Sequence, residues 1–143
     1  MMGGTNDNLE EVLKTNPNFY LKDIPYAITK ANQLLKASMP KLAINLLEKV
    51  LKKTGWDAQE VDLWEINEAF AMVTMAAIDE FKLDAEKVNI NGGACALGHP
   101  VGSTGSRIIL TLIHALKRTG GKKGIAALCI GGGEATAVAI EIL

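Results

Sequence analysis

Hydrophobic and polar residues follow two different periods along this chain, and the periods separate helices from strands. In residues 41–53 the apolar positions recur three and four residues apart, as they do on one face of an α-helix. Residues 68–81, rich in Ala and Met, and the apolar residues 103–118 are also predicted helices. Short apolar runs containing β-branched or aromatic residues predict strands at 61–66, 88–91, 124–130 and 135–143.

The order of these elements predicts the fold class. From residue 61 onward strands and helices alternate, which requires right-handed crossovers and a mostly parallel sheet with helices on both faces. The last two predicted strands are joined only by residues 131–134, which is too short for a crossover, so we expect them to pair antiparallel. The prediction is an α/β fold with a mixed, mostly parallel sheet.

The first 38 residues have a different character. A turn signal at Asn16-Pro17-Asn18 separates two short predicted helices, the second of which begins at Pro25. We therefore divide the chain into an atypical N-terminal helical segment, residues 1–38, and a domain of residues 39–143 that holds the sheet.

Composition narrows the class of protein. The chain has 143 residues, 48% of them hydrophobic, and a formal net charge of −1, which fits one globular domain without an electrostatic surface for nucleic acid. The first residues are polar, and no apolar run is long enough to span a bilayer, so we expect neither a secretory signal nor a membrane segment. The two cysteines are then expected to be reduced thiols in a cytoplasmic protein, and their spacing predicts no zinc site.

The candidate ligand site lies at the carboxyl ends of the predicted strands, where open α/β sheets bind ligands. Asn67 follows the first strand, Asn91-Gly92-Gly93 the second, and Cys129 ends the third before three glycines. Most of the glycines of the chain fall in this region, which indicates loops that pass close to a ligand.

Three residues at this edge could carry chemistry, and each also has an ordinary structural explanation. His99 lies in a loop before a proline, and it is either a general base or a histidine held for structure. Cys129 precedes glycines whose free N–H groups could hold an oxyanion, or it is a buried inert thiol. Asn67 could simply cap the following helix. His114, inside an apolar helix, is interpreted as a packing or interface residue, and Cys95, between two alanines, as a packing residue.

Four sequence blocks at these positions resemble the C-terminal signature blocks of the thiolase family, in particular its acetyl-CoA C-acetyltransferase branch. Their order and spacing also match the family, and the resemblance runs from about Val61 to Leu143. The blocks are Asn67-Glu68-Ala69-Phe70-Ala71, Asn91-Gly92-Gly93-Ala94, Gly98-His99-Pro100 with Gly102 and Gly105, and Cys129-Ile130-Gly131-Gly132-Gly133.

The resemblance implies a role for each matching residue. His99 would activate a nucleophilic thiol and help to hold a thioester oxygen, and Asn67 would fix a water that completes that oxyanion hole. Cys129 would be the second acid/base, the N–H of Gly131 would serve another oxyanion hole, and Phe70 would flank the pantetheine arm. The substrate would be a coenzyme A thioester, with no further cofactor. Claisen chemistry on a thioester needs both a stabilised enolate oxygen and an acid/base beside the α-carbon.

The chain also departs from the family. Thiolases carry the acylated cysteine in an N-terminal half that has no counterpart here, and Cys95 occupies a place where the family usually has an apolar residue. We therefore expect the C-terminal catalytic half of an acyl-CoA C-acyltransferase, inactive alone and working beside an N-terminal half or in a homo-oligomer. One alternative is a non-catalytic CoA-binding or truncated thiolase fragment. Another is a ketosynthase-like domain, which would be expected to carry a second histidine at the place of Asn67.

The helix at 103–118 carries apolar residues all round, which is typical of a buried helix. A single sheet covers only one side of it, so we expect the other side, rich in apolar residues such as Ile109 and Ile113, to mediate self-association or to be covered by residues 1–38.

Overall fold

The computed structural model describes residues 39–130 and 134–143, which belong to one compact unit, Ser38–Leu143. The helices predicted within residues 1–38, and the predicted site residue Gly131, lie outside the described residues.

The described sheet has three strands in the order β1 (Leu63–Ile66), β2 (Lys123–Ile130) and β3 (Glu134–Glu141). β1 and β2 are parallel, and Leu63 pairs with Gly124 at the start of the register. β2 and β3 are antiparallel, which confirms the predicted pairing of the last two strands. The fold is therefore α/β with a mixed sheet, made of one parallel and one antiparallel pair in the described part.

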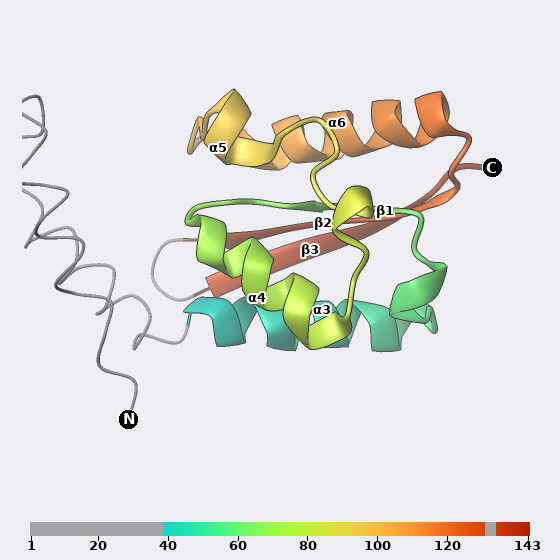
Figure 1. The fold of residues 1–143 in the computed structure, drawn as a ribbon, viewed down its shortest axis with the longest axis horizontal. Helices are drawn as coiled ribbons and strands as arrows, with labels where there is room; N and C mark the ends of the chain where they lie inside the picture. The colour runs from blue at the N-terminus through green and yellow to red at the C-terminus, as the bar shows by residue number, and fades with distance from the viewer. Residues whose placement is uncertain (1–38, 131–133) are drawn as a thin grey trace, which may run out of the picture. The chain divides into compact units, whose positions relative to one another are not determined.

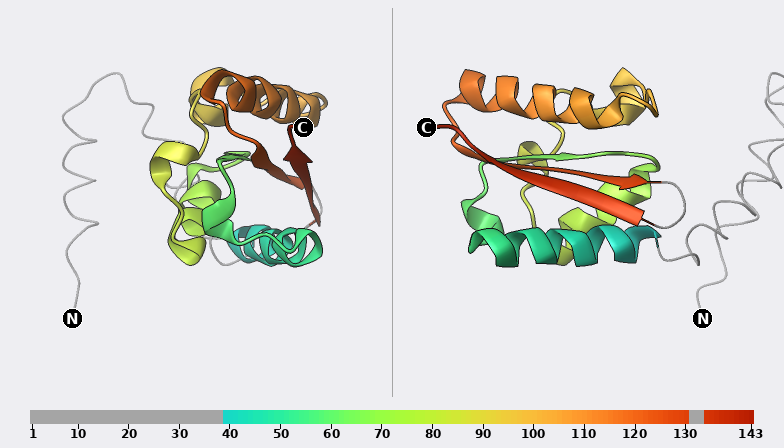
Figure 2. Two further views of the ribbon diagram at one scale, coloured as in Figure 1. Left: turned by 90° about the vertical axis from the view of Figure 1, so that its right-hand side faces the viewer. Right: turned by 180° about the vertical axis from the view of Figure 1, so that it is seen from behind.

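Helices cover both faces of this sheet (Figure 1). The helices α3 (Met39–Thr54) and α4 (Ala71–Phe81) lie against one face, and α6 (Thr104–Thr119) lies against the other with the short helix α5 (Gly93–Leu97) at one end. The two further views in Figure 2 show the same three layers.

The strands bury side chains on both sides, as strands between two helical layers must. Trp64, Ile66 and Ile125 pack with Leu47 of α3 and Ala77 of α4. The neighbouring positions face the other way and form a second apolar cluster with α6, which contains Leu63, Ala126, Ile108, Leu112, Ala115 and Leu116.

One side of α6 is buried and the other side is open in the described chain. Leu112 and Leu116 are fully buried, whereas Leu110 is 57% exposed. The helix also lies very close to the sheet, because a Cβ atom added at Gly124 would come within 2.8 Å of Leu116 Cδ1 and 2.9 Å of Leu112 Cδ1. A side chain at this point of β2 would require Leu112 and Leu116 to move.

The strand predicted at 88–91 is wrong. The structure has a single β-bridge there, between Trp64 and Val88, and the chain then turns because Asn89 takes a left-handed conformation with φ of 51°. The side chain of Asn89, rather than a strand backbone, hydrogen-bonds to Ile66. After two glycines with positive φ the chain forms α5, which the sequence pattern did not predict.

The helix predicted at 68–81 begins later than expected. It starts at Ala71 because Phe70 is extended, with φ of −143°, and it ends at Lys82 in the left-handed region. Residues Asn67 to Ala69 are thereby left in the connection between β1 and α4, and Asn67 does not serve as the helix cap.

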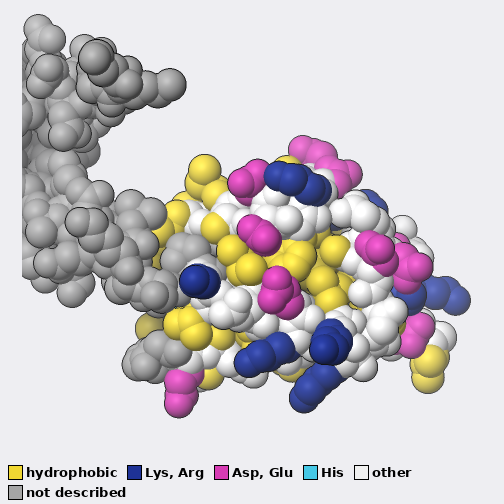
Figure 3. Space-filling model, turned by 90° about the horizontal axis from the view of Figure 1, so that it is seen from below, with side chains coloured by type: hydrophobic (Ala, Val, Ile, Leu, Met, Phe, Trp, Pro, Cys, Tyr) yellow, Lys and Arg dark blue, Asp and Glu magenta, His cyan; other side chains and the backbone are white. Residues whose placement is uncertain are grey.

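The outer face formed by α3 and α4 shows apolar side chains between Lys and acidic side chains (Figure 3). Met75 of α4 is 67% exposed. Within the described ranges, no helix has the length and apolar character that crossing a membrane would require.

Candidate active site

Asn67 and Cys129 lie beside each other at the carboxyl ends of the parallel strands β1 and β2. The backbone N–H of Asn67 donates to the carbonyl oxygen of Ala127 at 2.8 Å, which fixes the two strand ends in register. Both residues line a small apolar crevice, of about 10 Å³, together with Ala43, Leu46, Ile66, Val73, Ala127 and Leu128. This space holds about one water molecule and is too small for an acyl group with its carrier.

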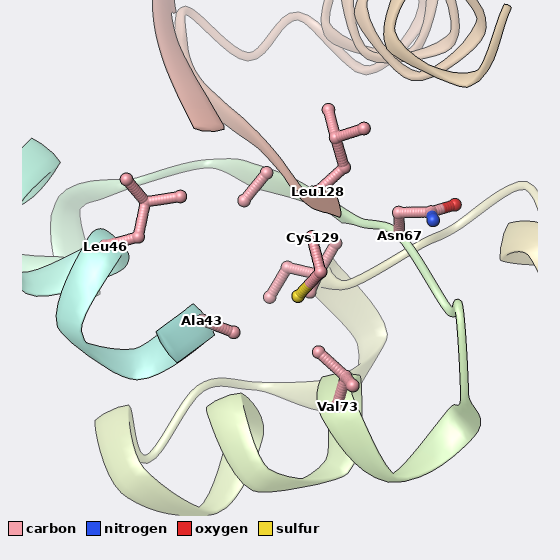
Figure 4. A pocket seen from close by; sticks show the side chains of 8 residues that line it. Ala43, Leu46, Asn67, Val73, Leu128 and Cys129 are labelled. Atoms are coloured by element: carbon pink, nitrogen blue, oxygen red, sulfur yellow. The ribbon is translucent and has the colours of Figure 1, made fainter. Parts of the chain in front are cut away.

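The two side chains leave the strand ends in different directions (Figure 4). The sulfur of Cys129 points into the crevice between α3 and α4, while the amide of Asn67 points away from the crevice. Burial raises the pKa of the Cys129 thiol, so this group holds its proton at neutral pH.

His99 lies in the exposed loop between α5 and α6 and is fixed by one hydrogen bond. Its Nδ1 is 2.7 Å from the hydroxyl oxygen of Thr104, a fully buried residue in the first turn of α6. The Thr104 hydroxyl donates its only proton to the carbonyl oxygen of Pro100 at 3.0 Å. With the hydroxyl proton directed to Pro100, Nδ1 of the neutral imidazole is the donor, which leaves the lone pair on Nε2 free to accept a proton.

Asn67 is tied to the same helix through Arg107. Nη2 of Arg107 donates to Oδ1 of Asn67 at 3.4 Å, and Nη1 of Arg107 lies 3.7 Å from Oε2 of Glu65. Glu65 and Asn67 are only 2% and 1% exposed. Burial is the main cause that raises the pKa of Glu65 to about 7, the charge of Glu68 adds to it, and the Arg107 charge opposes it.

The first turns of α6 thus connect two of the predicted site residues. Thr104, which holds His99, and Arg107, which holds Asn67, are three residues apart and lie on the same side of the helix. The structure places Asn67 and Cys129 at adjacent strand ends, with their side chains pointing in different directions, and it ties His99 to the helix that contacts Asn67. Within the described residues His99 does not line the crevice.

Phe70 lies at the N-terminal end of α4, three residues after Asn67, and is 43% exposed. It is available to a ligand at this edge of the sheet.

Glu68 anchors α5, the short helix that precedes the loop with His99. Its Oε2 accepts a hydrogen bond from the backbone N–H of Cys95 in α5 at 2.7 Å, and its Oε1 accepts one from Nδ2 of Asn89 at 3.4 Å. A Cβ at Gly93 would lie 2.7 Å from Oε2 of Glu68, so the carboxylate approaches α5 this closely only because residue 93 is glycine. The Asn67 block and the Gly92-Gly93 block are therefore in direct contact.

The expectation that Cys95 is a packing residue is wrong, because its side chain is exposed. A hydrogen bond with Glu68 is the main cause that raises the pKa of its thiol, with smaller contributions from desolvation and the Glu68 charge. A thiol of raised pKa is a poor nucleophile at neutral pH.

Sequence reasoning found no role for Arg107. The available signal was one arginine next to the apolar run of a predicted helix, together with one carboxylate, Glu65, inside an apolar strand. Two charged residues in apolar segments indicate an ion pair. They do not indicate that Arg107 also contacts Asn67.

The fold and this arrangement of strand ends are those of a thiolase-like C-terminal domain. A family model described as "Thiolase, C-terminal domain" matches residues 19–142. The chain belongs to this family.

Relatives and solved structures agree with this assignment. The chain is 53% identical over 98 residues to the cytosolic acetyl-CoA acetyltransferase of Mus musculus, covering 68% of this chain and 25% of that one. It is 47% identical over 120 residues to a probable acetyl-CoA acetyltransferase of Dictyostelium discoideum, covering 84% and 28%.

The crystal structure of the Bacillus anthracis acetyl-CoA acetyltransferase superposes with a TM-score of 0.70 at 50% identity, covering 73% of this chain and 27% of that chain. The structure of human mitochondrial 3-ketoacyl-CoA thiolase in complex with CoA gives 0.69 at 45% identity, with the same coverage. The chain spans about a quarter of the length of the curated relatives it matches.

Proposed function

We propose that this chain is the C-terminal catalytic half of an acyl-CoA C-acyltransferase that forms or cleaves acetoacetyl-CoA. The observation that carries the proposal is the pairing of Asn67 and Cys129 at adjacent strand ends, with His99 and Asn67 both held by one side of α6. The names of the relatives, acetyl-CoA acetyltransferases, support the same activity. We propose a cytoplasmic location on the same ground, because the mouse relative is a cytosolic protein.

The proposed roles follow from the protonation state and exposure of each group. Nε2 of His99 accepts the proton of the nucleophilic thiol. The partly buried thiol of Cys129 is protonated at neutral pH, so it first donates a proton, to the departing CoA or to the carbon, and then accepts one in the reverse direction. Nδ2 of Asn67 has no partner among the described residues and is free to donate to a water in the oxyanion hole.

The remaining contacts are to the substrate. Phe70, partly exposed beside Asn67, flanks the pantetheine arm, and the N–H of Gly131 serves the second oxyanion hole. The coenzyme A thioester is itself the substrate, and the proposal includes no other cofactor and no metal.

Neither cysteine of this chain is assigned as the nucleophile, because the thiol of Cys95 has a raised pKa and Cys129 has the acid/base role. We propose that the nucleophile comes from a thiolase N-terminal half. Alone, the chain is then expected to be inactive.

The test is reconstitution. The pure chain is assayed for thiolysis of acetoacetyl-CoA, alone and after co-expression with the part of the Bacillus anthracis enzyme that precedes its matched region. We expect no turnover alone and turnover by the pair, reduced at least about a hundredfold by His99→Ala or Cys129→Ala. His114→Ala, an exposed histidine on α6, is the matched control and should leave turnover unchanged.

Turnover by the pure chain would contradict the proposed division of roles. A folded, associated pair that binds CoA without turnover would instead support the alternative of a non-catalytic CoA-binding or truncated fragment.

A further inference from the structure

The side-chain amide of Asn67 has one orientation that its neighbours allow. A guanidinium group has five N–H donors and no acceptor, so the atom of Asn67 that faces Arg107 must be the oxygen. The structure has this arrangement, with Nη2 of Arg107 donating to Oδ1 of Asn67 at 3.4 Å. The NH2 group of Asn67 is thereby turned away from Arg107, and among the described residues its nitrogen is buried without a hydrogen-bond partner.

Arg107 itself is held by Glu65 from the strand that ends at Asn67. The side chain of Glu65 is 3% exposed and that of Arg107 is 17% exposed, and the closest atoms of the pair, Nη1 and Oε2, are 3.7 Å apart. Burying two charges costs desolvation free energy, and only close contacts between the charges offset this cost. This pair does not make such contacts. Nε and Nη1 of Arg107 also lack hydrogen-bond partners among the described residues.

A pair kept only for stability would be expected to have shorter contacts or to be replaced by apolar residues of similar volume. The additional contact that this pair makes is the one to Asn67. We propose that Arg107 is a positioning residue that fixes the side-chain amide of Asn67 with its NH2 group free, and that Glu65 holds Arg107 for this purpose. This inference rests on the proposed function, in which that NH2 group donates to a water.

The first arm of the test needs no activity. The side-chain NH2 resonances of Asn67 in the full chain are assigned with Asn67→Asp and followed by NMR in Arg107→Gln. We expect both NH2 resonances to move toward the positions of a mobile asparagine amide, because glutamine can face the Asn67 amide with either of its own polar atoms. Arg118→Gln is the matched control, since Arg118 lies on the same helix and also donates to an asparagine, Asn91, at 2.8 Å, but is exposed. It should leave the Asn67 resonances unchanged.

Arg107→Gln leaves Glu65 buried without a countercharge and can prevent folding. The double variant Glu65→Gln/Arg107→Gln removes both charges and keeps two hydrogen-bonding side chains of similar size. We expect it to fold and to show the same change in the Asn67 NH2 resonances. If these resonances are those of the wild type in a folded double variant, Arg107 does not position Asn67.

The second arm uses the reconstituted pair of halves. The double variant should lower kcat about tenfold or more with KM changed by less than about twofold, because the lost interaction acts on the reacting oxygen and not on the CoA arm. Wild-type kcat in the folded double variant would overturn the proposal. If the wild-type pair has no activity, the proposed function fails, and the NMR arm still decides whether Arg107 positions Asn67.

Discussion

The side chain of Asn89 hydrogen-bonds to Ile66 as a neighbouring strand would do. Its Oδ1 accepts the backbone N–H of Ile66 at 2.8 Å, and its Nδ2 donates to the carbonyl oxygen of Ile66 at 2.9 Å. One amide thus satisfies both backbone polar groups of the last residue of β1, directly before Asn67, at an edge of the sheet where the described chain has no further strand.

We expect Asn89→Ala to lower the free energy of unfolding by about 1–3 kcal/mol, because it leaves the buried N–H of Ile66 without a partner. The C=O of Ile66 loses one of its two hydrogen bonds and keeps the one from the Thr74 hydroxyl at 3.1 Å. The measurement is urea unfolding of the full chain. Asn89→Gly removes the same amide without the cost of placing a Cβ at φ of 51°, so it separates the hydrogen bonds from the backbone conformation. Asn45→Ala, on the exposed face of α3, should change stability by less than about 0.5 kcal/mol. Equal losses at positions 45 and 89 would contradict this account.

The contact between Asn89 and Ile66 also shows which elements a hydrophobic pattern predicts and which it does not. The helices at 41–53 and 103–118 were predicted within two residues of their observed ends, because long periodic runs are set by their own apolar face. The run Val88 to Asn91 has the composition of a strand, and its hydrophobicity is used for packing. The run nevertheless contacts the backbone of Ile66, the last residue of β1, through the side chain of Asn89. Periodicity carries no information about such side-chain hydrogen bonds.

The tautomer of His99 should depend on Thr104. In Thr104→Val the hydroxyl is replaced by a methyl group of the same size, so Nδ1 of His99 loses its acceptor. We expect the 15N shifts of the neutral imidazole to move from a predominant Nδ1–H form toward a mixture of the two tautomers. Thr104→Ser keeps the hydroxyl and should retain the wild-type shifts. An unchanged tautomer in Thr104→Val would show that another group holds Nδ1.

Glu65 should make the chain less stable as the pH rises. Its folded pKa of about 7 lies above the ordinary value of 4.5, so between these values the folded state keeps a proton that the unfolded state has lost. The contribution of this group to the free energy of unfolding therefore falls from pH 4.5 to 7 and is constant above that range. Glu65→Gln should remove this slope in urea unfolding measured across the same window.

Asp62 acts in the opposite direction and outside this window. Hydrogen bonds from the backbone N–H groups of Lys123 and Lys122 lower its pKa, so its contribution is lost only as the pH falls below 3.8. A slope between pH 4.5 and 7 that persists in Glu65→Gln would therefore assign the effect to a different group.

The open side of α6 should mediate self-association of the chain. Leu110 is 57% exposed there, next to the partly buried Ile109 and Ile113, and contiguous apolar surface of this kind is rare on soluble monomers. We expect sedimentation velocity to show an oligomer for the wild type and a shift toward monomer for Leu110→Lys. Met75→Lys, at a 67% exposed apolar position on α4, is the control and should leave the oligomer intact. Equal sedimentation of the wild type and Leu110→Lys would exclude this surface.

The candidate site was predictable in part. Asn67, His99 and Cys129 follow from strand ends and from the resemblance of four blocks, because these signals are local in the chain. Arg107 and Thr104 are different, because their roles depend on which residues α6 meets, Asn67 and His99, at sequence separations of 40 and 5. Such contacts depend on the distance of the helix from the sheet and on its rotation about its own axis. The spacing of hydrophobic residues predicts neither quantity.

That distance is set at Gly124, at the opposite end of the helix from the site. Leu112 and Leu116 are fully buried and would lie within 3.0 Å of a Cβ at Gly124, so a side chain there would require these leucines or that end of α6 to move. A rigid helix of this length, about 24 Å, would tilt as a whole and displace Thr104 and Arg107 at its other end. A substitution at Gly124 can therefore alter the contacts of His99 and Asn67 without touching either residue. Under the proposed function, we expect such a substitution to reduce turnover although every proposed site residue is unchanged.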